Sequence, residues 1–135
     1  MRYFGVEEAN RLIPLLTRTF IQVRPWVARA QALVRELESL QDAGARPERT
    51  APLRAERDDL IEKIRVQLEQ FQELGMEVKA ADGLVDFRAL KAGRPVYLCW
   101  RFGEPVVSHW HELEGGFAGR QPIVHARDFA PSYLS

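Results

Sequence analysis

The strongest constraint on the fold is a run of mainly apolar residues in the first half of the chain, spaced alternately by four and three positions. Its members are Leu12, Leu16, Thr19, Val23, Trp26, Ala30, Leu33, Leu37 and Leu40. A heptad pattern of this length predicts a long helix with one buried face. Pro25 lies within the run, but the phase is the same on both sides of it, which indicates a kink and not a break. We expect Asn10 to cap the regular helix.

A second helical stripe follows a polar connector at residues 41–52. Its apolar positions are Leu53, Leu60, Ile64, Phe71 and Leu74. Thr50 is the expected N-cap of this helix, and Gly75 is the expected residue just beyond its C-terminus. A short connector between two such stripes predicts an antiparallel helical hairpin over residues 6–74.

The two helices are expected to differ in length, because the second stripe is shorter by about a third. The second helix therefore cannot cover the whole seam of the first. Leu12 to Val23 must be buried either against the C-terminal half of the chain or against another subunit. We prefer a symmetric homodimer through the helices, in the manner of a coiled coil, because cyclic dimers are the commonest assemblies.

After Gly75 the pattern changes to the two-residue alternation that is typical of strands. The predicted strands are residues 77–79, 84–87, 96–102 and 106–111. Asp82-Gly83 and residues 102–105 supply turns between them. The sequence thus predicts a single α+β domain, residues 1–135: the helical hairpin with its kinked first helix, then a small antiparallel β-meander as a cap at 76–120. Residues 121–135 are expected to form a C-terminal arm.

The register of the last two predicted strands decides which side chains share a face. A two-residue loop between them would place Leu98 opposite His109. His109 and His111 would then lie on the more apolar face, together with Trp100, against the helices. His111 is nearer the strand end, so it is the histidine expected to reach solvent.

Three residues near this strand exit are candidates for acid–base catalysis, namely His111, Glu112 and Asp86. A buried Asp86 would need a partner such as Arg101, Arg120 or His111. A carboxylate–histidine pair is suited to proton transfer. The alternative is that Asp86 forms a structural ion pair or caps a turn.

A divalent metal such as zinc is a second possibility, because His109 and His111 place two imidazoles on one strand face. Glu114, Glu112 or Asp86 could add an oxygen ligand. The alternative is one packed and one surface histidine, each satisfied by hydrogen bonds. No other cofactor is expected, and Cys99 has the context of an inert buried thiol.

The glycine-rich segment 115–120 could form a backbone nest for an anion, with Arg120 making a bidentate contact. The alternative is a tight turn that needs positive φ at its glycines. The residues expected to bind a ligand are Arg120, Trp110, Glu104 and Arg101.

Charge and composition exclude some partners. Nineteen basic residues balance nineteen acidic ones, so we expect neither nucleic acid nor an anionic membrane surface as a partner. No window approaches the ~20 apolar residues of a membrane span. One cysteine, no internal disulfide and an N-terminus without a signal-peptide pattern favour the cytoplasm.

Several specific motifs are spread over nearly the whole chain. They are Phe4, Glu8-Ala9-Asn10, Leu12, Pro14, Glu73-Leu74-Gly75, Val78-Lys79, Gly83-Leu84-Val85-Asp86-Phe87, Gly93-Arg94, Tyr97-Leu98-Cys99-Trp100, Gly103-Glu104-Pro105, Trp110-His111-Glu112 and Gly116-Phe117-Ala118-Gly119-Arg120. Together they resemble an uncharacterised bacterial family, domain of unknown function 2203. The chain departs from that family's pattern at Arg88, where the family favours proline, and position 109 is often not histidine. The resemblance implies no activity.

Two function hypotheses follow. The preferred one is a non-enzymatic, dimeric interaction or ligand-binding module, in which the β-cap binds a peptide or a small polar or anionic ligand. The competing one is a small metal-dependent or acid–base hydrolase that uses His111, Glu112, Asp86 and Arg120. The sequence leaves open whether the chain is an enzyme.

Overall fold

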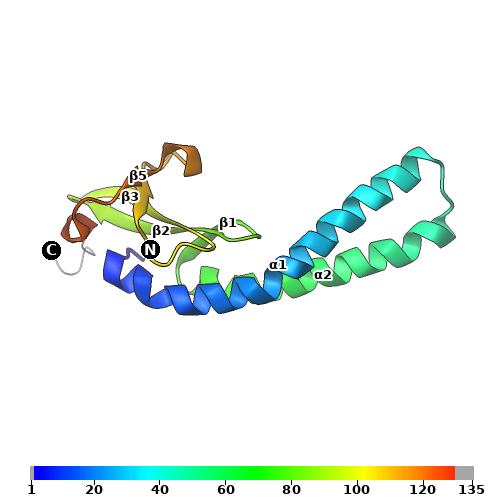
Figure 1. Ribbon diagram of the computed structural model, residues 1–135, viewed down its shortest axis with the longest axis horizontal. Coiled ribbons are helices and arrows are strands. Elements are labelled where there is room, and N and C mark those ends of the chain that lie inside the picture. Colours follow the sequence, from blue (N-terminus) through cyan, green and yellow to red (C-terminus); the bar gives the residue numbers. More distant parts are fainter. Residues whose placement is uncertain (1, 130–135) are drawn as a thin grey trace.

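The computed structural model describes residues 2–129 as a long helical hairpin with a five-stranded antiparallel sheet at one end (Figure 1). The helices are α1 (Val6–Asp42) and α2 (Pro47–Glu73). The strands, in their order across the sheet, are β1 (Met76–Ala80), β2 (Leu84–Lys91), β3 (Arg94–Arg101), β4 (His109–His111) and β5 (Gln121–Pro122). The described residues also form two short 3-10 helices, η1 (Phe117–Gly119) and η2 (Ala126–Phe129). The predicted α+β hairpin and meander are confirmed.

α1 begins earlier than predicted because Gly5, and not Asn10, is its N-cap. The backbone nitrogen of Gly5 donates a hydrogen bond of 3.1 Å to Oε1 of Glu8, which satisfies a group that the helix itself leaves free. α1 changes direction about half-way along its length (Figure 1), and Pro25 lies inside it, so the predicted kink is confirmed. Within residues 2–129, neither helix carries an apolar stretch of membrane-spanning length.

α2 also begins earlier than predicted. Pro47 occupies its first turn, where a residue without a backbone N–H costs nothing, and the connector shrinks to residues 43–46. Thr50, the expected N-cap, lies within the helix, and its hydroxyl donates to the carbonyl oxygen of Pro47 at 3.4 Å. Gly75 has a φ of +95° and directly follows the C-cap residue Leu74, as predicted.

The main core lies between the sheet and the half of the hairpin nearest to it. Its fully buried members include Phe4, Leu16, Phe20, Phe71, Met76, Val85, Phe87, Leu98 and Trp100. The ring of Phe20 lies 5.9 Å from that of Phe71 and 6.0 Å from that of Trp100, which links both helices to β3. The seam from Leu12 to Val23 is therefore covered by the C-terminal half, the first of the two expected solutions.

The far half of the hairpin has a separate and much smaller core. Ala30, Leu33 and Leu60 are buried there, with Trp26 and Leu53 packed against them. In Figure 1 most of this half projects beyond the sheet, and Ala81 of the β1–β2 turn lies next to its base. The molecule thus consists of a well-packed end and a thin, projecting end.

The pairing of β3 with β4 differs from the predicted register by one residue. Leu98 lies opposite Trp110, and Cys99 lies opposite His109. Because opposite residues share a face, Trp110 joins the core, and His109 and His111 lie on the face away from the helices. The predicted placement of the two histidines against the helices was wrong, and so was the expectation that His111 reaches solvent, because it is buried.

The reason is the link between these strands, residues 102–108, which is not a tight hairpin. Nε1 of Trp100 donates to the carbonyl oxygen of Glu104 at 2.9 Å and holds the chain in a turn there. The backbone nitrogen of Val107 then donates to Oδ1 of Asn10 at 2.7 Å instead of pairing with β3. The link is thereby pulled towards α1, and β4 begins only at His109.

The start of the expected C-terminal arm is part of the domain. Residues 121–122 pair with β4, and the backbone nitrogen of Ala92 donates to the carbonyl oxygen of Asp128 at 3.1 Å. Phe129 is buried, and its ring lies 6.0 Å from that of Trp110. The apolar ring of Phe129 accounts for this docking, since it covers the outer edge of the main core. Residues 130–135 of the expected arm lie outside the described residues.

Candidate functional site

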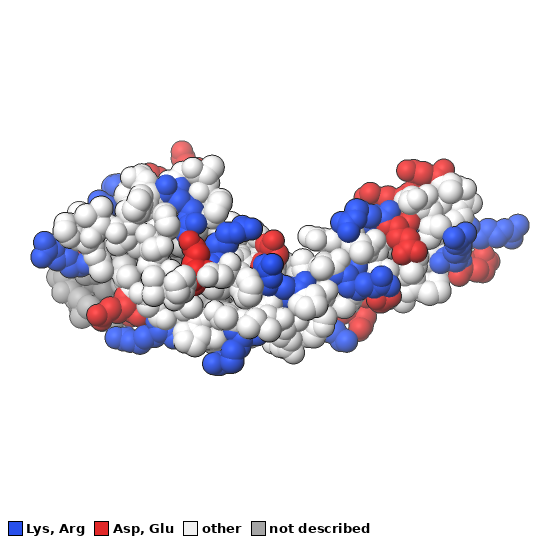
Figure 2. Space-filling view, in the orientation of Figure 1, with Lys and Arg blue, Asp and Glu red and all other residues white. Residues whose placement is uncertain are grey.

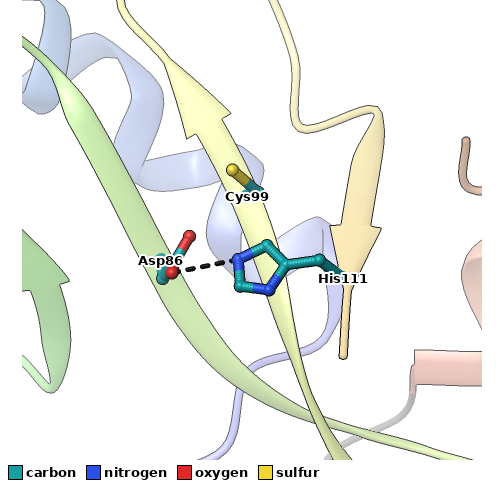
Figure 3. Close-up of side chains that lie close together, drawn as sticks. All are labelled: Asp86, Cys99 and His111. Atoms are coloured by element: carbon teal, nitrogen blue, oxygen red, sulfur yellow. Dashed lines mark hydrogen bonds and ion pairs between the residues drawn. The ribbon is translucent and has the colours of Figure 1, made fainter. Parts of the chain in front are cut away.

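Three buried side chains from three neighbouring strands meet on the face of the sheet away from the helices: Asp86 of β2, Cys99 of β3 and His111 of β4 (Figure 3). Their exposed fractions are 3, 0 and 2 %. One potential ligand atom of each lies within 4.8 Å of the other two. The β2–β3 register creates this juxtaposition, because it sets Asp86 directly opposite Cys99. We refer to these three residues as the buried cluster.

His111 is held by a hydrogen bond at each ring nitrogen. Nε2 lies 3.0 Å from Oδ2 of Asp86, and Nδ1 lies 2.6 Å from the backbone carbonyl oxygen of Glu112. A carbonyl oxygen only accepts, so Nδ1 donates, and a second proton lies between Nε2 and Oδ2. The ring of Tyr97 packs at 5.4 Å from the imidazole. The orientation of His111 is therefore fixed from three sides.

Cys99 is a protonated thiol in this setting. Burial, followed by the nearby negative charge of Asp86, raises the pKa of Cys99 to about 12. The thiolate, and not the thiol, is the nucleophilic form, so this cysteine is unreactive at neutral pH. The second carboxylate oxygen of Asp86, Oδ1, is buried and has no hydrogen-bond partner. An orphaned carboxylate oxygen in a buried site is costly, and Oδ1 is the one side-chain oxygen or nitrogen of the cluster without a partner.

A polar network continues along the same face of the sheet. The hydroxyl of Tyr97 donates to Oε2 of Glu77 at 2.7 Å and accepts from Nη2 of Arg88 at 3.1 Å. Burial raises the pKa of Tyr97, and the hydrogen bond donated to Glu77 raises it further. Burial alone would raise the pKa of Glu77, but hydrogen bonds from Tyr97 and Lys79 outweigh it and hold that pKa below its ordinary value.

Two of the residues predicted to bind a ligand, Arg120 and Glu104, are engaged with each other. Nη2 of Arg120 donates to both carboxylate oxygens of Glu104, at 2.7 and 2.9 Å, and the ring of Phe117 lies 4.7 Å from its guanidinium carbon. A guanidinium that is already neutralised by a carboxylate attracts a second anion only weakly. The predicted contact of Arg120 with a free anion is thus made internally by Glu104.

The other predicted ligand-binding residues do not converge. Trp110 is buried in the main core, and Arg101 is exposed, with its guanidinium 5.4 Å from the ring of Phe117. The side chain of Glu112 forms an ion pair with Arg94, and only its backbone contacts His111.

The predicted metal set is not assembled. Within residues 2–129, the buried cluster is the one place where three such ligand side chains come together, and neither His109 nor Glu114 belongs to it. Nδ1 of His109 lies 2.9 Å from the hydroxyl of Ser108 and 3.8 Å from the carboxylate of Glu104. Two of the predicted site residues, Asp86 and His111, are brought together, and the third member is one that the sequence analysis treated as inert.

Cys99 could have been found from the turn between β2 and β3. Ala92 and Gly93 form a two-residue turn in which both residues have positive φ, 50° and 80°. Turns of this type connect the strands of tight hairpins. Counting outwards from Lys91 opposite Arg94 leads to Asp86 opposite Cys99. The signal was therefore present, but it required a strand longer than the one predicted.

Comparison with known proteins gives one finding. A family model described as "Uncharacterized conserved protein (DUF2203)" matches residues 2–123. No curated protein and no solved structure matches the chain.

Proposed function

We propose that this chain, which belongs to the DUF2203 family of uncharacterised conserved proteins, is a non-enzymatic interaction module that forms a homodimer through the projecting half of its helical hairpin. The observation that carries the proposal is an apolar groove along that half. A chain with a single cysteine forms no internal disulfide. This suits a reducing compartment, so we place the module in the cytoplasm.

The groove has a volume of about 650 Å³ and is lined mainly by apolar side chains of both helices. These are Val27, Ala30, Val34, Ile61 and Ile64. Val34 and Ile61 are 39 and 50 % exposed. Ala30 belongs both to the groove and to the small core of the projecting half, so the groove is an open side of that core. Exposed apolar surface that is continuous with a core is typical of an association site.

The projecting half also lacks enough core to account for its length. The buried residues of this half are Val27, Ala30, Leu33, Leu37, Thr50 and Leu60, which are few for two helices of this length, and helices depend on such packing for most of their stability. A second hairpin laid against the groove would complete a four-helix bundle, in which each helix buries its apolar stripe. The packing in such a bundle would be like that of a coiled coil, as the heptad seam predicts.

Charge favours a second copy as the occupant. Residues 27–64 carry seven basic and eight acidic side chains, so two copies of this segment do not repel each other through net charge. Figure 2 shows the two signs interspersed along the projecting half, with uncharged surface between them. A mixed surface of this kind can be complementary to itself, as a two-fold symmetric interface requires.

The geometry supports the hydrolase alternative less well. Asp86 and His111 form the pair that it needs, but both are buried, and the Cys99 thiol beside them is protonated. Glu112 and Arg120 are engaged with Arg94 and Glu104. A general base must come within hydrogen-bond reach of a substrate proton, and Nε2 of His111 already faces Asp86.

Sedimentation equilibrium tests the dimer. The mass of one chain is 15.5 kDa, and at micromolar concentration we expect twice that mass. Ile61→Arg places a charge in the groove and should return the protein to the mass of one chain. Val124→Arg is the matched control, because Val124 is 80 % exposed and lies far from the hairpin in sequence, and it should leave the dimer intact.

Two results would overturn the proposal. One is a wild-type mass of a single chain at every concentration up to the millimolar range. The other is that the Ile61→Arg variant forms a dimer as stable as that of the Val124→Arg variant. Circular dichroism of both variants confirms that the helices are retained.

A further inference from the structure

We infer that the buried cluster is a metal site, in which Asp86, Cys99 and His111 bind one zinc ion or a similar borderline transition-metal ion. This inference is independent of the hairpin and of the proposed dimer. It differs from the metal set expected from the sequence, which paired His111 with His109 and did not include Cys99.

The donor atoms of the buried cluster are of the kinds that bind zinc. A thiol sulfur, an imidazole nitrogen and a carboxylate oxygen are the three kinds of side-chain donor that zinc takes in proteins. Magnesium and calcium prefer oxygen ligands, so a sulfur donor disfavours them. Three protein ligands leave a fourth tetrahedral position for a further ligand.

The distances between the donor atoms also suit a metal ion. Donor atoms around a tetrahedral zinc ion lie roughly 3.3–3.7 Å apart, given metal–ligand distances of about 2.0–2.3 Å. The three donor atoms of the buried cluster lie within 4.8 Å of one another, and Nε2 of His111 is 3.0 Å from Oδ2 of Asp86. Small side-chain rotations therefore suffice, and no strand has to move.

One carboxylate oxygen of Asp86 has no partner in the buried cluster. Oδ1 of Asp86 is buried without a hydrogen bond, while Oδ2 is satisfied by His111. Figure 3 shows the Asp86 carboxylate facing the imidazole of His111, with Cys99 beside them on the strand between theirs. A cation placed between the three side chains would satisfy this orphaned oxygen and compensate the cost of leaving it buried.

The second ring nitrogen of His111 is bonded as it is in metal sites. Histidine ligands of metals almost always donate their other ring N–H to a carbonyl or carboxylate, which fixes the ring and its tautomer. Nδ1 of His111 donates in this way to the backbone carbonyl of Glu112, so Nε2 is the nitrogen that faces the cluster. Gly115 lies against His111 and Glu112, where an added Cβ would be 3.4–3.5 Å from their atoms, so the segment that follows β4 packs closely over the histidine.

The charges balance when a divalent ion binds. The ion displaces the proton of the Cys99 thiol and the proton that His111 and Asp86 share, and two protons leave for solvent. The bound state then holds a thiolate, a carboxylate, a neutral imidazole and the divalent ion, with a net charge of zero. A neutral ensemble is the form in which charged groups are tolerated in a buried position.

Cobalt binding to the untagged, full-length protein tests the inference. The protein is freed of metal with a chelator, titrated with Co²⁺ and followed by absorption, and zinc is then added in competition. We expect one ion per chain, a thiolate-to-cobalt charge-transfer band in the near ultraviolet, and loss of that band when zinc displaces cobalt. Cys99→Ser should abolish the band and weaken affinity by more than about 100-fold, because losing a ligand costs more than losing its support.

His109→Gln is the matched control, since His109 lies on the same strand but outside the buried cluster, and this variant should bind as the wild type does. X-ray absorption of zinc-loaded wild type provides a second reading that needs no variant, and it should show one sulfur among nitrogen and oxygen ligands. Absence of binding at millimolar metal would overturn the inference. So would binding without a sulfur ligand, or equal loss of affinity in Cys99→Ser and His109→Gln.

Discussion

Oδ1 of Asn10 accepts a hydrogen bond of 2.7 Å from the backbone nitrogen of Val107, across 97 positions of the sequence. This contact joins the second turn of α1 to the link between β3 and β4. Val107 is 3 % exposed, so water has little access to its backbone nitrogen. One side chain of a helix therefore replaces the strand pairing that this segment would otherwise form.

We expect Asn10→Leu to destabilise the fold by about 1–3 kcal/mol, because it leaves a buried N–H without an acceptor. Asn10→Asp keeps an oxygen at the same position and should cost much less. Urea denaturation of both variants measures the difference. Equal stability of Asn10→Leu and the wild type would mean that another acceptor replaces the amide.

Asp86 and His111 should be strongly coupled. In the metal-free protein, His111→Phe removes the proton donor of a buried carboxylate and should cost about 3–5 kcal/mol. The double variant Asp86→Leu/His111→Phe removes both polar groups and should recover most of that loss, while the ring contact with Tyr97 is kept. A double-mutant cycle measured by urea denaturation gives the coupling energy. Additive effects of the two substitutions would contradict the contact.

Cys99 should make the metal-free fold sensitive to alkaline pH. Its folded-state pKa of about 12 lies above the ordinary value of 9.0, so the stabilisation is complete below pH 9.0 and is lost as pH rises towards 12. Cys99→Ala lacks this group, so its stability should fall less between these pH values. Urea unfolding of wild type and variant at a series of alkaline pH values tests this. Parallel pH profiles would contradict it.

Glu77 should have the opposite dependence. Its pKa is lowered in the folded state, so its contribution is present above the ordinary value of 4.5 and is lost as pH falls below it. Glu77→Gln should therefore be less stable than the wild type at neutral pH, by up to about 1 kcal/mol because the group is partly exposed. At about pH 3 the two proteins should be closer in stability. Thermal unfolding at both pH values provides the comparison, and a constant difference would contradict the expectation.

The helical half of the fold could be predicted because its signals are local. A seam that repeats every seven residues determines a long helix without reference to anything distant, and its unchanged phase across Pro25 distinguishes a kink from a break. The first residues of the two helices were harder to predict. Gly5 caps α1 without a side chain of its own, through the carboxylate of Glu8, and it has none of the side chains that usually indicate a cap.

The β half required contacts that no local pattern contains. Alternation identified the strands near β3 and β4, but their register depends on Asn10, which lies almost a hundred positions earlier. A slip of one residue moves every side chain of a strand to the opposite face. The sequence could therefore identify Asp86 as a group in need of a partner, and name His111 among the candidates. Placing Cys99 beside them required strands longer than the predicted ones, paired across the two-residue turn at Ala92 and Gly93.

The two separate cores divide the molecule into a part whose composition is constrained and a part whose length is free. The main core, against which the sheet packs, takes its helix residues from the first half of α1 and the last turns of α2. Seven residues added to or removed from each helix beyond Trp26, in matching positions, would keep the seam in phase and leave the sheet unchanged. The projecting half is thus a spacer that evolution or a designer can lengthen in whole heptads, and its length sets how far the sheet stands from whatever the hairpin tip contacts.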